Sequence, residues 1–379
     1  MSVAESAALA RRHAAVRRAL DDRGLSALAV THLPNVRYLT NHAGSAGLAV
    51  VTAERLHLLV DGRYAEAVRR LQDSNAACPG ATIHVVEGSG SYDEALADLL
   101  APLDGPVGFE SAHLTVSRHA WWRRALERRG ADAALEPVEG LVERLRMIKD
   151  AGEIAALREA AARLAPVVEA AFGAVRAGVS ERRVAAAIDA ALGAAGFERP
   201  AFETIVAGGP NSALPHHHPG SRALAAGDLV VLDFGGVLGG YCSDLTRTVA
   251  LGPIDAERRA IYEAVREAQA AALEAVRPGV DTSAVDAAAR QVLVERGLGE
   301  AFSHGTGHGL GLEVHEDPRV SRSREGAEGT RLEPGMVFTV EPGAYVPGTG
   351  GVRIEDDVLV TSAGCEILTD VPRELLTLA

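Results

Sequence analysis

Short apolar runs alternate with helix-like stretches over the first third of the chain. Residues 5–24 carry apolar positions at helical spacing and end at Gly24, and the apolar run Leu25–Val30 that follows predicts a strand. Leu48–Thr52 and Leu56–Val60 flank a short polar turn and predict a hairpin. Strands alternating with helices in this way predict one mixed α/β domain. The remaining expected elements are strands at Thr82–Val86 and Val107–Phe109 and helices near residues 64–71, 92–100 and 117–129.

The pattern changes to longer helices near residue 145. An apolar stripe with spacings of three and four residues then predicts an amphipathic helix. Its members are Ile154, Leu157, Ala161, Leu164 and Val168. We therefore expect two domains, residues 1–145 and residues 146–379.

A short internal sequence repeat divides the second domain. Ala174–Ser180 (Ala-Val-Arg-Ala-Gly-Val-Ser) returns about a hundred residues later as Ala275–Asp281 (Ala-Val-Arg-Pro-Gly-Val-Asp). Ser and Asp are good N-cap residues, so each copy predicts the start of a helix, which Gly196 and Gly297 would end. A strand and a hairpin follow each helix. This sequence repeat therefore favours two structural repeats.

Two carboxylates are expected on one face of a glycine-rich hairpin in the first repeat. The apolar strand Leu229–Phe234 carries Asp233, and the return strand Tyr241–Val249 carries Asp244. If the hairpin closes around Leu238–Gly239, the two aspartates lie directly across from each other, with Cβ atoms about 5 Å apart. Two bare carboxylates so placed repel each other, and partial burial adds to the cost.

The second repeat has the same arrangement. Glu341 ends an apolar strand, a Pro/Gly-rich turn follows, and the strand Val352–Val360 carries Glu355. Pairing around Gly348 places Glu341 opposite Glu355. Arg353 is two residues from Glu355 and therefore points to the same face. There it would pair with a ligand carboxylate or, as the weaker alternative, with a substrate carboxylate.

The glycine-dense stretch Ser303–Glu316 contributes His304, His308 and His315. Glycines around imidazoles permit close approach of a metal or ligand. Four carboxylates and one imidazole form an oxygen-rich ligand set whose charge two divalent cations would neutralise, which suits Mn, Co, Fe or Zn. The alternative is that these acids are ordinary solvated strand ends paired with arginines.

The amino-acid composition limits the class of protein, its partners and the compartment that we expect. Hydrophobic residues make up 47% of the chain and charged residues 23%, as in ordinary globular proteins. The net charge of -13 argues against nucleic acid as the main partner, because phosphate binding requires a basic face. Three widely separated cysteines indicate reduced thiols. Neither a signal-peptide pattern nor a membrane-spanning apolar run is present, so we expect a cytoplasmic protein without a membrane partner.

These residues resemble the pita-bread metallopeptidases, specifically the Xaa-Pro branch that comprises prolidase and aminopeptidase P. The resemblance covers the whole chain and implies an α+β protein with a small creatinase-like N-terminal domain and a pita-bread catalytic domain with a pseudo-twofold repeat. Five motifs carry it in the family's order: Asp233-Phe-Gly-Gly, Ser243-Asp244-Leu-Thr-Arg-Thr, His304-Gly-Thr-Gly-His308-Gly, Thr339-Val-Glu341-Pro-Gly and Val352-Arg-Ile-Glu355-Asp.

The resemblance also implies the metal site. Two divalent metals, most commonly Mn with Co, Zn or Fe as alternatives, would be bridged by Asp244 and Glu355 and by a hydroxide that acts as the nucleophile. Glu341 would in addition carry a proton to the leaving imino nitrogen. The full ligand set would be Asp233, Asp244, His308, Glu341 and Glu355.

Further side chains are implied around the substrate. His315 would contact the substrate carbonyl, His304 would lie behind the ligands, and His216 would lie on a loop over the site. Its neighbours His217 and His218 are expected to be exposed. Arg353 completes the expected catalytic group.

The implied activity is hydrolysis of the Xaa–Pro bond of small peptides at a free N-terminus, by a dipeptidase or an aminopeptidase. The N-terminal domain carries no chemistry of its own yet makes up over a third of the chain, so we expect it to form subunit contacts in a homodimer or larger homo-oligomer. Methionine aminopeptidases share the five ligands but not the long N-terminal domain, and a broader aminopeptidase is a related alternative. Creatinase shares the N-terminal domain but lacks the full carboxylate set. Some pita-bread proteins are catalytically inactive binding modules that have lost ligands, whereas this chain fills all five positions.

Overall fold

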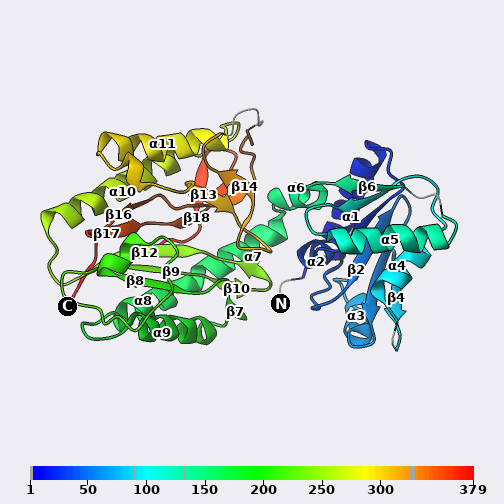
Figure 1. The fold of residues 1–379 in the computed structure, drawn as a ribbon, viewed down its shortest axis with the longest axis horizontal. Coiled ribbons are helices and arrows are strands. Elements are labelled where there is room, and N and C mark those ends of the chain that lie inside the picture. The colour runs from blue at the N-terminus through cyan, green and yellow to red at the C-terminus, as the bar shows by residue number, and fades with distance from the viewer. Residues whose placement is uncertain (1–2, 89, 132–133, 324–328) are drawn as a thin grey trace. The chain divides into compact units, whose positions relative to one another are not determined.

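The computed structural model describes residues 3–88, 90–131, 134–323 and 329–379. These residues form two compact units, Val3–Arg146 and Met147–Ala379 (Figure 1). Within the described ranges, none of the helices is both long and apolar enough to cross a membrane.

The N-terminal unit is built on a six-stranded sheet with the order β4-β3-β2-β1-β5-β6. The predicted hairpin is confirmed as the antiparallel pair β2–β3. The short helix α2, the strand β6 and the helix α6 were not predicted, because runs of four to eight residues show too little periodicity. The strands are β1 (Ala27–Val30), β2 (Leu48–Thr52), β3 (Leu56–Asp61), β4 (Ala81–Val86), β5 (Val107–Glu110) and β6 (Leu135–Val138), and the helices are α1 (Ser6–Asp21), α2 (Leu33–Thr40), α3 (Ala65–Gln72), α4 (Tyr92–Leu100), α5 (Val116–Arg128) and α6 (Leu141–Met147).

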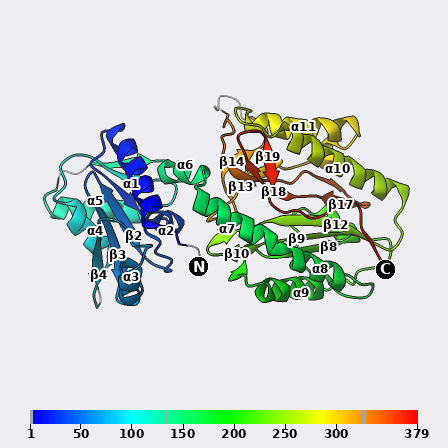
Figure 2. The ribbon, with the colours of Figure 1, turned by 180° about the vertical axis from the view of Figure 1, so that it is seen from behind.

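The C-terminal unit places helices on both sides of its strands. Figures 1 and 2 show α8 and α9 along one side and α10 and α11 along the opposite side. The helices are α7 (Ala151–Ala162), α8 (Leu164–Ala174), α9 (Glu181–Ala194), α10 (Ala256–Ala275) and α11 (Thr282–Glu295), with short 3₁₀ helices η1 (Gly209–Ala213) and η2 (Gly299–Ala301). One sheet has the order β20-β12-β9-β8 and the other β14-β13-β15-β18-β19.

The strands of this unit form two sheets and two hairpin extensions. The first sheet contains β8 (Ile205–Gly208), β9 (Leu229–Phe234), β12 (Leu245–Leu251) and β20 (Thr377–Leu378), and the second β13 (Gly307–Gly309), β14 (Glu316–Val320), β15 (Val337–Val340), β18 (Asp356–Val360) and β19 (Cys365–Ile367). The extensions contain β7 (Arg199–Pro200), β10 (Gly236–Leu238) and β11 (Tyr241–Cys242), and β16 (Gly343–Val346) and β17 (Gly350–Arg353).

The two predicted repeats are present. Each consists of a helix pair, α8–α9 or α10–α11, followed by strands that pack beneath it. Gly178 and Gly279, at matching places between the helices, both adopt a φ of 82°, a conformation that favours glycine. Each repeat has its own apolar core, one containing Leu164, Ile188 and Leu232 and the other Val265, Leu293 and Phe338.

The register of the first hairpin differs from the prediction by two residues. Asp233 pairs with Thr246, not with Asp244, because the turn is the two-residue loop Gly239–Gly240. Both glycines have positive φ, 60° and 86°, which fits the tight turns that match strand twist. Side chains alternate with a period of two, so Asp244 still lies on the same face as Asp233, diagonally displaced.

The register of the second hairpin is confirmed. Val340 pairs with Asp356 and Gly343 with Arg353, which leaves Glu341 facing Glu355 between them.

The predicted amphipathic stripe, in contrast, is divided between two helices, α7 and α8, at Arg163. Pro166 lies in the first turn of α8, where it is tolerated, but within one continuous helix it would remove a hydrogen bond and clash with the preceding turn.

Candidate metal centre

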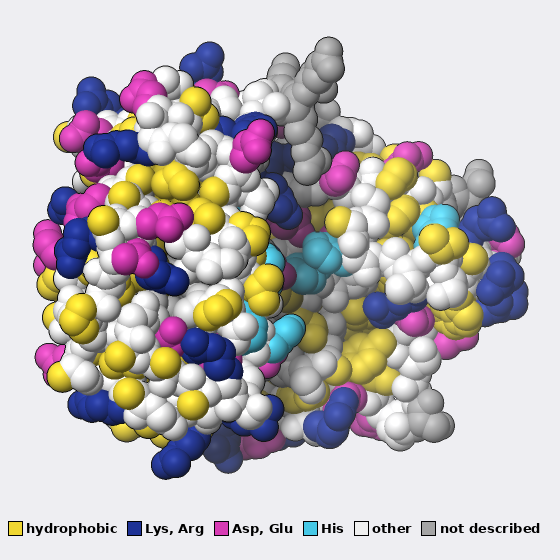
Figure 3. Space-filling view, turned by 60° about the vertical axis from the view of Figure 1, so that its left-hand side comes forward, with side chains coloured by type: hydrophobic (Ala, Val, Ile, Leu, Met, Phe, Trp, Pro, Cys, Tyr) yellow, Lys and Arg dark blue, Asp and Glu magenta, His cyan; other side chains and the backbone are white. Residues whose placement is uncertain are grey.

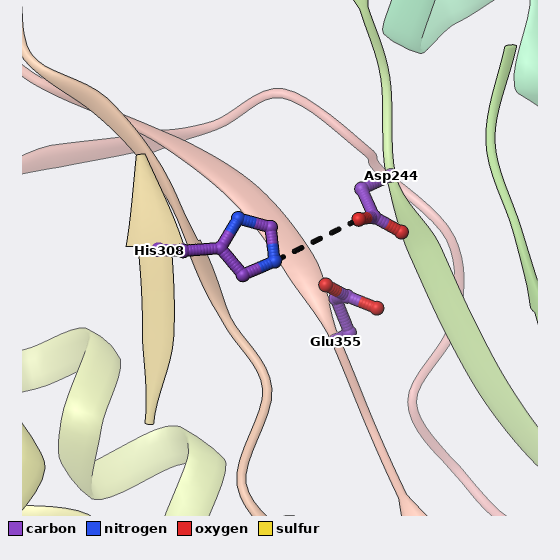
Figure 4. Close-up of side chains that lie close together, drawn as sticks. All are labelled: Asp244, His308 and Glu355. Carbon is purple, nitrogen blue, oxygen red and sulfur yellow. Dashed lines mark ion pairs between the residues drawn. The ribbon is translucent and has the colours of Figure 1, made fainter. Parts of the chain in front are cut away.

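The five predicted ligands come from both repeats and converge at the ends of paired strands. Asp233 lies in β9 and Asp244 just before β12, whereas Glu355 lies just before β18. His308 is the middle residue of β13, and Glu341 follows β15. One ligand atom from each of Asp244, His308 and Glu355 lies within 4.8 Å of the other two. Figure 4 shows the His308 ring pointing toward the Asp244 carboxylate, with the Glu355 carboxylate beside it.

A cleft of about 590 Å³ opens onto this cluster. Figure 3 shows several histidine side chains gathered close together, in cyan, beside it. Every predicted site residue lines the cleft: Asp233, Asp244, His308, Glu341 and Glu355, together with His216, His304, His315 and Arg353.

The carboxylates of the cluster have too few hydrogen-bond donors and cations around them among the described residues. The buried atoms Asp233 Oδ1 and Asp244 Oδ1 have no hydrogen-bond partner among the described residues. Burial raises the pKa values of Asp244 and Glu355 well above their usual range, and the neighbouring carboxylates raise them further. Unpaired buried carboxylate oxygens are costly, and divalent cations would satisfy them. The donor set therefore fits the metal ions that the sequence predicts.

His308 is suited to act as a neutral ligand. Burial lowers its pKa to about 3, with His315 adding to the effect. Its Nε2 atom lies 3.3 Å from Glu341 Oε1 and 3.9 Å from Asp244 Oδ2. A neutral imidazole offers its lone pair to a metal.

The arginine and two hydroxyl groups fix the carboxylates. Arg353 forms an ion pair with Asp233, as the sequence predicted, and also donates to Tyr345 Oη at 2.8 Å. Thr246 Oγ1 donates to Glu355 Oε2 at 2.6 Å. Thr246 and Tyr345 were missed by the sequence analysis. Thr246 could have been found, because it is two residues after Asp244 and so shares its face.

The remaining histidines have different environments. His304 contacts Tyr345 Oη through Nε2 at 2.9 Å, and burial lowers its pKa to about 4. The His315 ring lies against His308 with a centroid distance of 4.2 Å, and His216 is exposed in the cleft. His218 is exposed as expected. His217 is not, because its Nε2 atom pairs with the buried Glu181 at 2.9 Å.

Arg319 is a cleft residue that the sequence did not single out. It lies across from His308 in the β13–β14 pair. Its guanidinium forms no hydrogen bond or ion pair with any residue in the described ranges, and it is exposed. An unpaired cation beside this carboxylate cluster indicates a place for an anionic group of a ligand.

Comparisons with known proteins agree over the whole chain. Residues 155–362 match metallopeptidase family M24, and residues 12–148 match the creatinase/prolidase N-terminal domain. An Xaa-Pro dipeptidase from Pyrococcus horikoshii is 36% identical over 94% of this chain and 96% of its own length. The structure of an Xaa-Pro dipeptidase from Bacillus anthracis has a TM-score of 0.90 and 37% identity, covering 98% of this chain and 100% of that one. An X-Pro aminopeptidase structure from Thermotoga maritima has a TM-score of 0.83 and 31% identity, covering 93% and 98%.

We expect the carboxylate cluster to contribute less stability to the metal-free protein as the pH rises. Burial raises the pKa of Glu341 to about 7, and those of Asp244 and Glu355 are raised too. The unfolded chain releases these protons at lower pH than the folded chain does, so the contribution of these carboxylates to folding becomes less favourable between about pH 4.5 and pH 7. The lowered pKa values of His304 and His308 act in the opposite direction, so the quantity to compare is the difference between the two forms. The melting temperature of dialysed, metal-free protein should fall relative to that of metal-loaded protein over this range.

Glu203→Gln serves as a control for this measurement, because that exposed acid lies outside the ligand set. The variant should retain the difference between metal-free and metal-loaded protein. Parallel melting curves for the two forms across the pH range would contradict the interpretation.

Proposed function

The chain belongs to metallopeptidase family M24, and we propose that it hydrolyses the Xaa–Pro bond of dipeptides that have a free N-terminus. The observation that carries this proposal is a buried carboxylate cluster in a histidine-lined cleft that also holds an unpaired arginine. The Xaa-Pro dipeptidases that resemble the chain over nearly its full length support the same activity.

We propose that two divalent cations, Mn in the first instance, are held by Asp233, Asp244, His308, Glu341 and Glu355. Asp244 and Glu355 come from different repeats and lie within 4.8 Å of each other and of His308, which supports the proposal that they would be the ligands shared by the two cations. Two divalent cations, when bound, would polarise the scissile carbonyl and activate a water molecule for attack. The homodimer stays a prediction from the sequence.

Glu341 is the proposed proton carrier. Its carboxylate lies in the cleft, beside His308. A carboxylate so placed can take a proton at Oε1 or Oε2 from the attacking water and pass it to the proline nitrogen. Thr339 Oγ1 donates to Oε1 at 3.3 Å and thereby orients the carboxylate.

The histidines supply the contacts that a proline substrate needs. A peptide bond to proline has no N–H group, so the site must hold the carbonyl oxygen and the ring instead. His315 and His216 lie at the open side of the cleft, where each could donate a hydrogen bond to that oxygen. His304 is more buried and acts through Tyr345, which Arg353 also holds.

Arg319 favours a dipeptide over a longer chain. A dipeptide places its C-terminal carboxylate one residue beyond the scissile bond, where a free guanidinium can form a charge-assisted pair. Arg319 is the strand partner of His308, whereas Ile205, which lines the same cleft, is the strand partner of Asp233. The amine and side chain of Xaa would then lie toward Asp233.

We expect Asp244→Asn to reduce bound metal from about two equivalents to one or fewer, since the bridging position loses its charge. Elemental analysis after dialysis measures this, and turnover should fall in parallel. Asp370→Asn, at an exposed acid outside the cleft, should change neither quantity. Two retained equivalents with more than about a tenth of wild-type turnover would rule out the bridging role.

Ala-Pro should be hydrolysed far faster than Ala-Ala or Met-Ala by the metal-loaded enzyme, because the site relies on histidines rather than on a substrate N–H group. Release of free proline or alanine provides the measurement. Equal rates on all three peptides would replace the proposal with a broader aminopeptidase. Faster cleavage of Ala-Pro-Ala than of Ala-Pro would indicate an aminopeptidase for longer peptides.

Arg319→Met should raise KM for Ala-Pro by a factor of about 10 or more, as expected for loss of a charge-assisted pair. KM for Ala-Pro amide, which has no carboxylate, should be unchanged in the variant. Arg322→Met, which removes a nearby exposed cation, is the matched control. An equal rise in KM for the acid and the amide would show that Arg319 has no role in binding the carboxylate.

A further inference from the structure

A fully buried carboxylate outside the cleft forms its side-chain hydrogen bonds with a single loop. Glu181 is the first residue of α9 and has an exposed fraction of 0%. Its Oε1 atom accepts hydrogen bonds from Gly208 N and from Asn211 Nδ2, both at 2.9 Å. Its Oε2 atom pairs with His217 Nε2 at 2.9 Å and accepts from Gly220 N at 3.1 Å.

These four partners span the loop that carries His216. Gly208 ends β8 at the start of the loop, and Gly220 lies near its end. Burial acts to raise the pKa of Glu181, but the hydrogen bonds outweigh this effect and hold the pKa below its usual value. An ionised carboxylate is costly to bury unless its lone pairs are filled, and here the loop alone fills them.

The His216 side chain has no hydrogen-bond partner among the described residues, but both of its neighbours are anchored. The carbonyl oxygen of Pro215 accepts from Arg353 Nη1 at 3.2 Å, and Arg353 also pairs with Asp233. On the other side, His217 is held by Glu181. The residue before His216 is therefore held to the carboxylate cluster through Arg353, and the residue after it is held to α9 through Glu181.

We propose that Glu181, acting through His217, is a positioning residue that holds His216 over the cleft. This inference rests on the proposed function in one respect, namely that His216 contacts the substrate. It assigns different tasks to adjacent histidines that both line the cleft: His216 is exposed there, whereas His217 is half-buried and pairs through Nε2 with Glu181. A displacement of about 1 Å in a substrate-contacting group can cost up to a factor of 100 in rate.

A double-mutant cycle tests whether Glu181 acts through His216. Glu181→Gln keeps the shape but has one acceptor oxygen in place of two, so it cannot accept from the Gly208–Asn211 pair and the His217–Gly220 pair at the same time. Its kcat on Ala-Pro should fall about 10-fold with metal content unchanged. In a background of His216→Ala the same substitution should cost less than about twofold, because the group that it positions is already gone.

Substitutions of His217 test the same positioning role independently. His217→Ala should lower kcat like Glu181→Gln, whereas His217→Gln, whose amide can still donate to Glu181, should keep most of the activity. Glu198→Gln, at an exposed acid beyond the end of α9, is the control and should match wild type. If Glu181→Gln fails to fold, the cycle is completed with His217→Ala and His216→Ala. Independent, multiplying effects, or an unchanged kcat in both variants, would overturn the inference.

A measurement without substrate separates this inference from the proposed activity. Amide hydrogen exchange across residues 208–220 should be at least about 10-fold faster in His217→Ala than in wild type or Glu198→Gln. If the wild-type enzyme cleaves no Xaa–Pro peptide, the proposed function fails, and this exchange rate alone decides whether Glu181 holds the loop. Unchanged exchange would overturn the positioning role.

Discussion

Mutual repulsion among four carboxylates in one cleft is the constraint on which the C-terminal unit depends. Arg353 offsets the charge of Asp233, but Asp233 Oδ1 and Asp244 Oδ1 still have no donor among the described residues. Such a cluster is tolerated only with added positive charge or with bound protons, and protonation is what the raised pKa values of Asp244 and Glu355 express. Divalent cations therefore serve the fold as well as the chemistry.

A buried polar network holds these carboxylates against their repulsion. Arg247 donates to the carbonyl oxygens of Thr246 and Glu355 and pairs with Asp356 Oδ1 at 2.7 Å. Asp244 N donates to Asp357 Oδ2 at 3.0 Å. These contacts join the two hairpins at the positions that carry Asp244 and Glu355. Because a buried charge left without its partner is strongly destabilising, the network favours one arrangement of the two repeats.

The repeats explain why the ligand set is nearly symmetric and the cleft around it is not. Each repeat contributes one hairpin with two carboxylates on one face, and each packs its own helix pair against the outer side. The exposed groups that line the cleft come from segments that differ between the repeats: His216 from the loop after η1, and His315 and Arg319 from the β13–β14 region. The carboxylate cluster thus follows from the repeated strands, and the rest of the cleft lining from the loops.

The sequence by itself determined which residues meet in the cleft. Strand alternation fixed the face of each acid, so even a register that was wrong by two residues still placed Asp233 and Asp244 together. The repeat and the second hairpin register were also predictable, because N-cap, glycine and apolar positions are local signals. The short elements α2, β6 and α6 gave no such signal.

Only the tertiary structure decided which partner each polar side chain has. Glu181 and His217 are 36 residues apart, and Arg353 and Pro215 are 138 apart, so no local pattern relates them. The free guanidinium of Arg319 likewise becomes meaningful only when β14 brings it beside His308. Periodicity acts within one strand or helix and fixes which way a side chain points, whereas the contact that it makes depends on how distant segments pack.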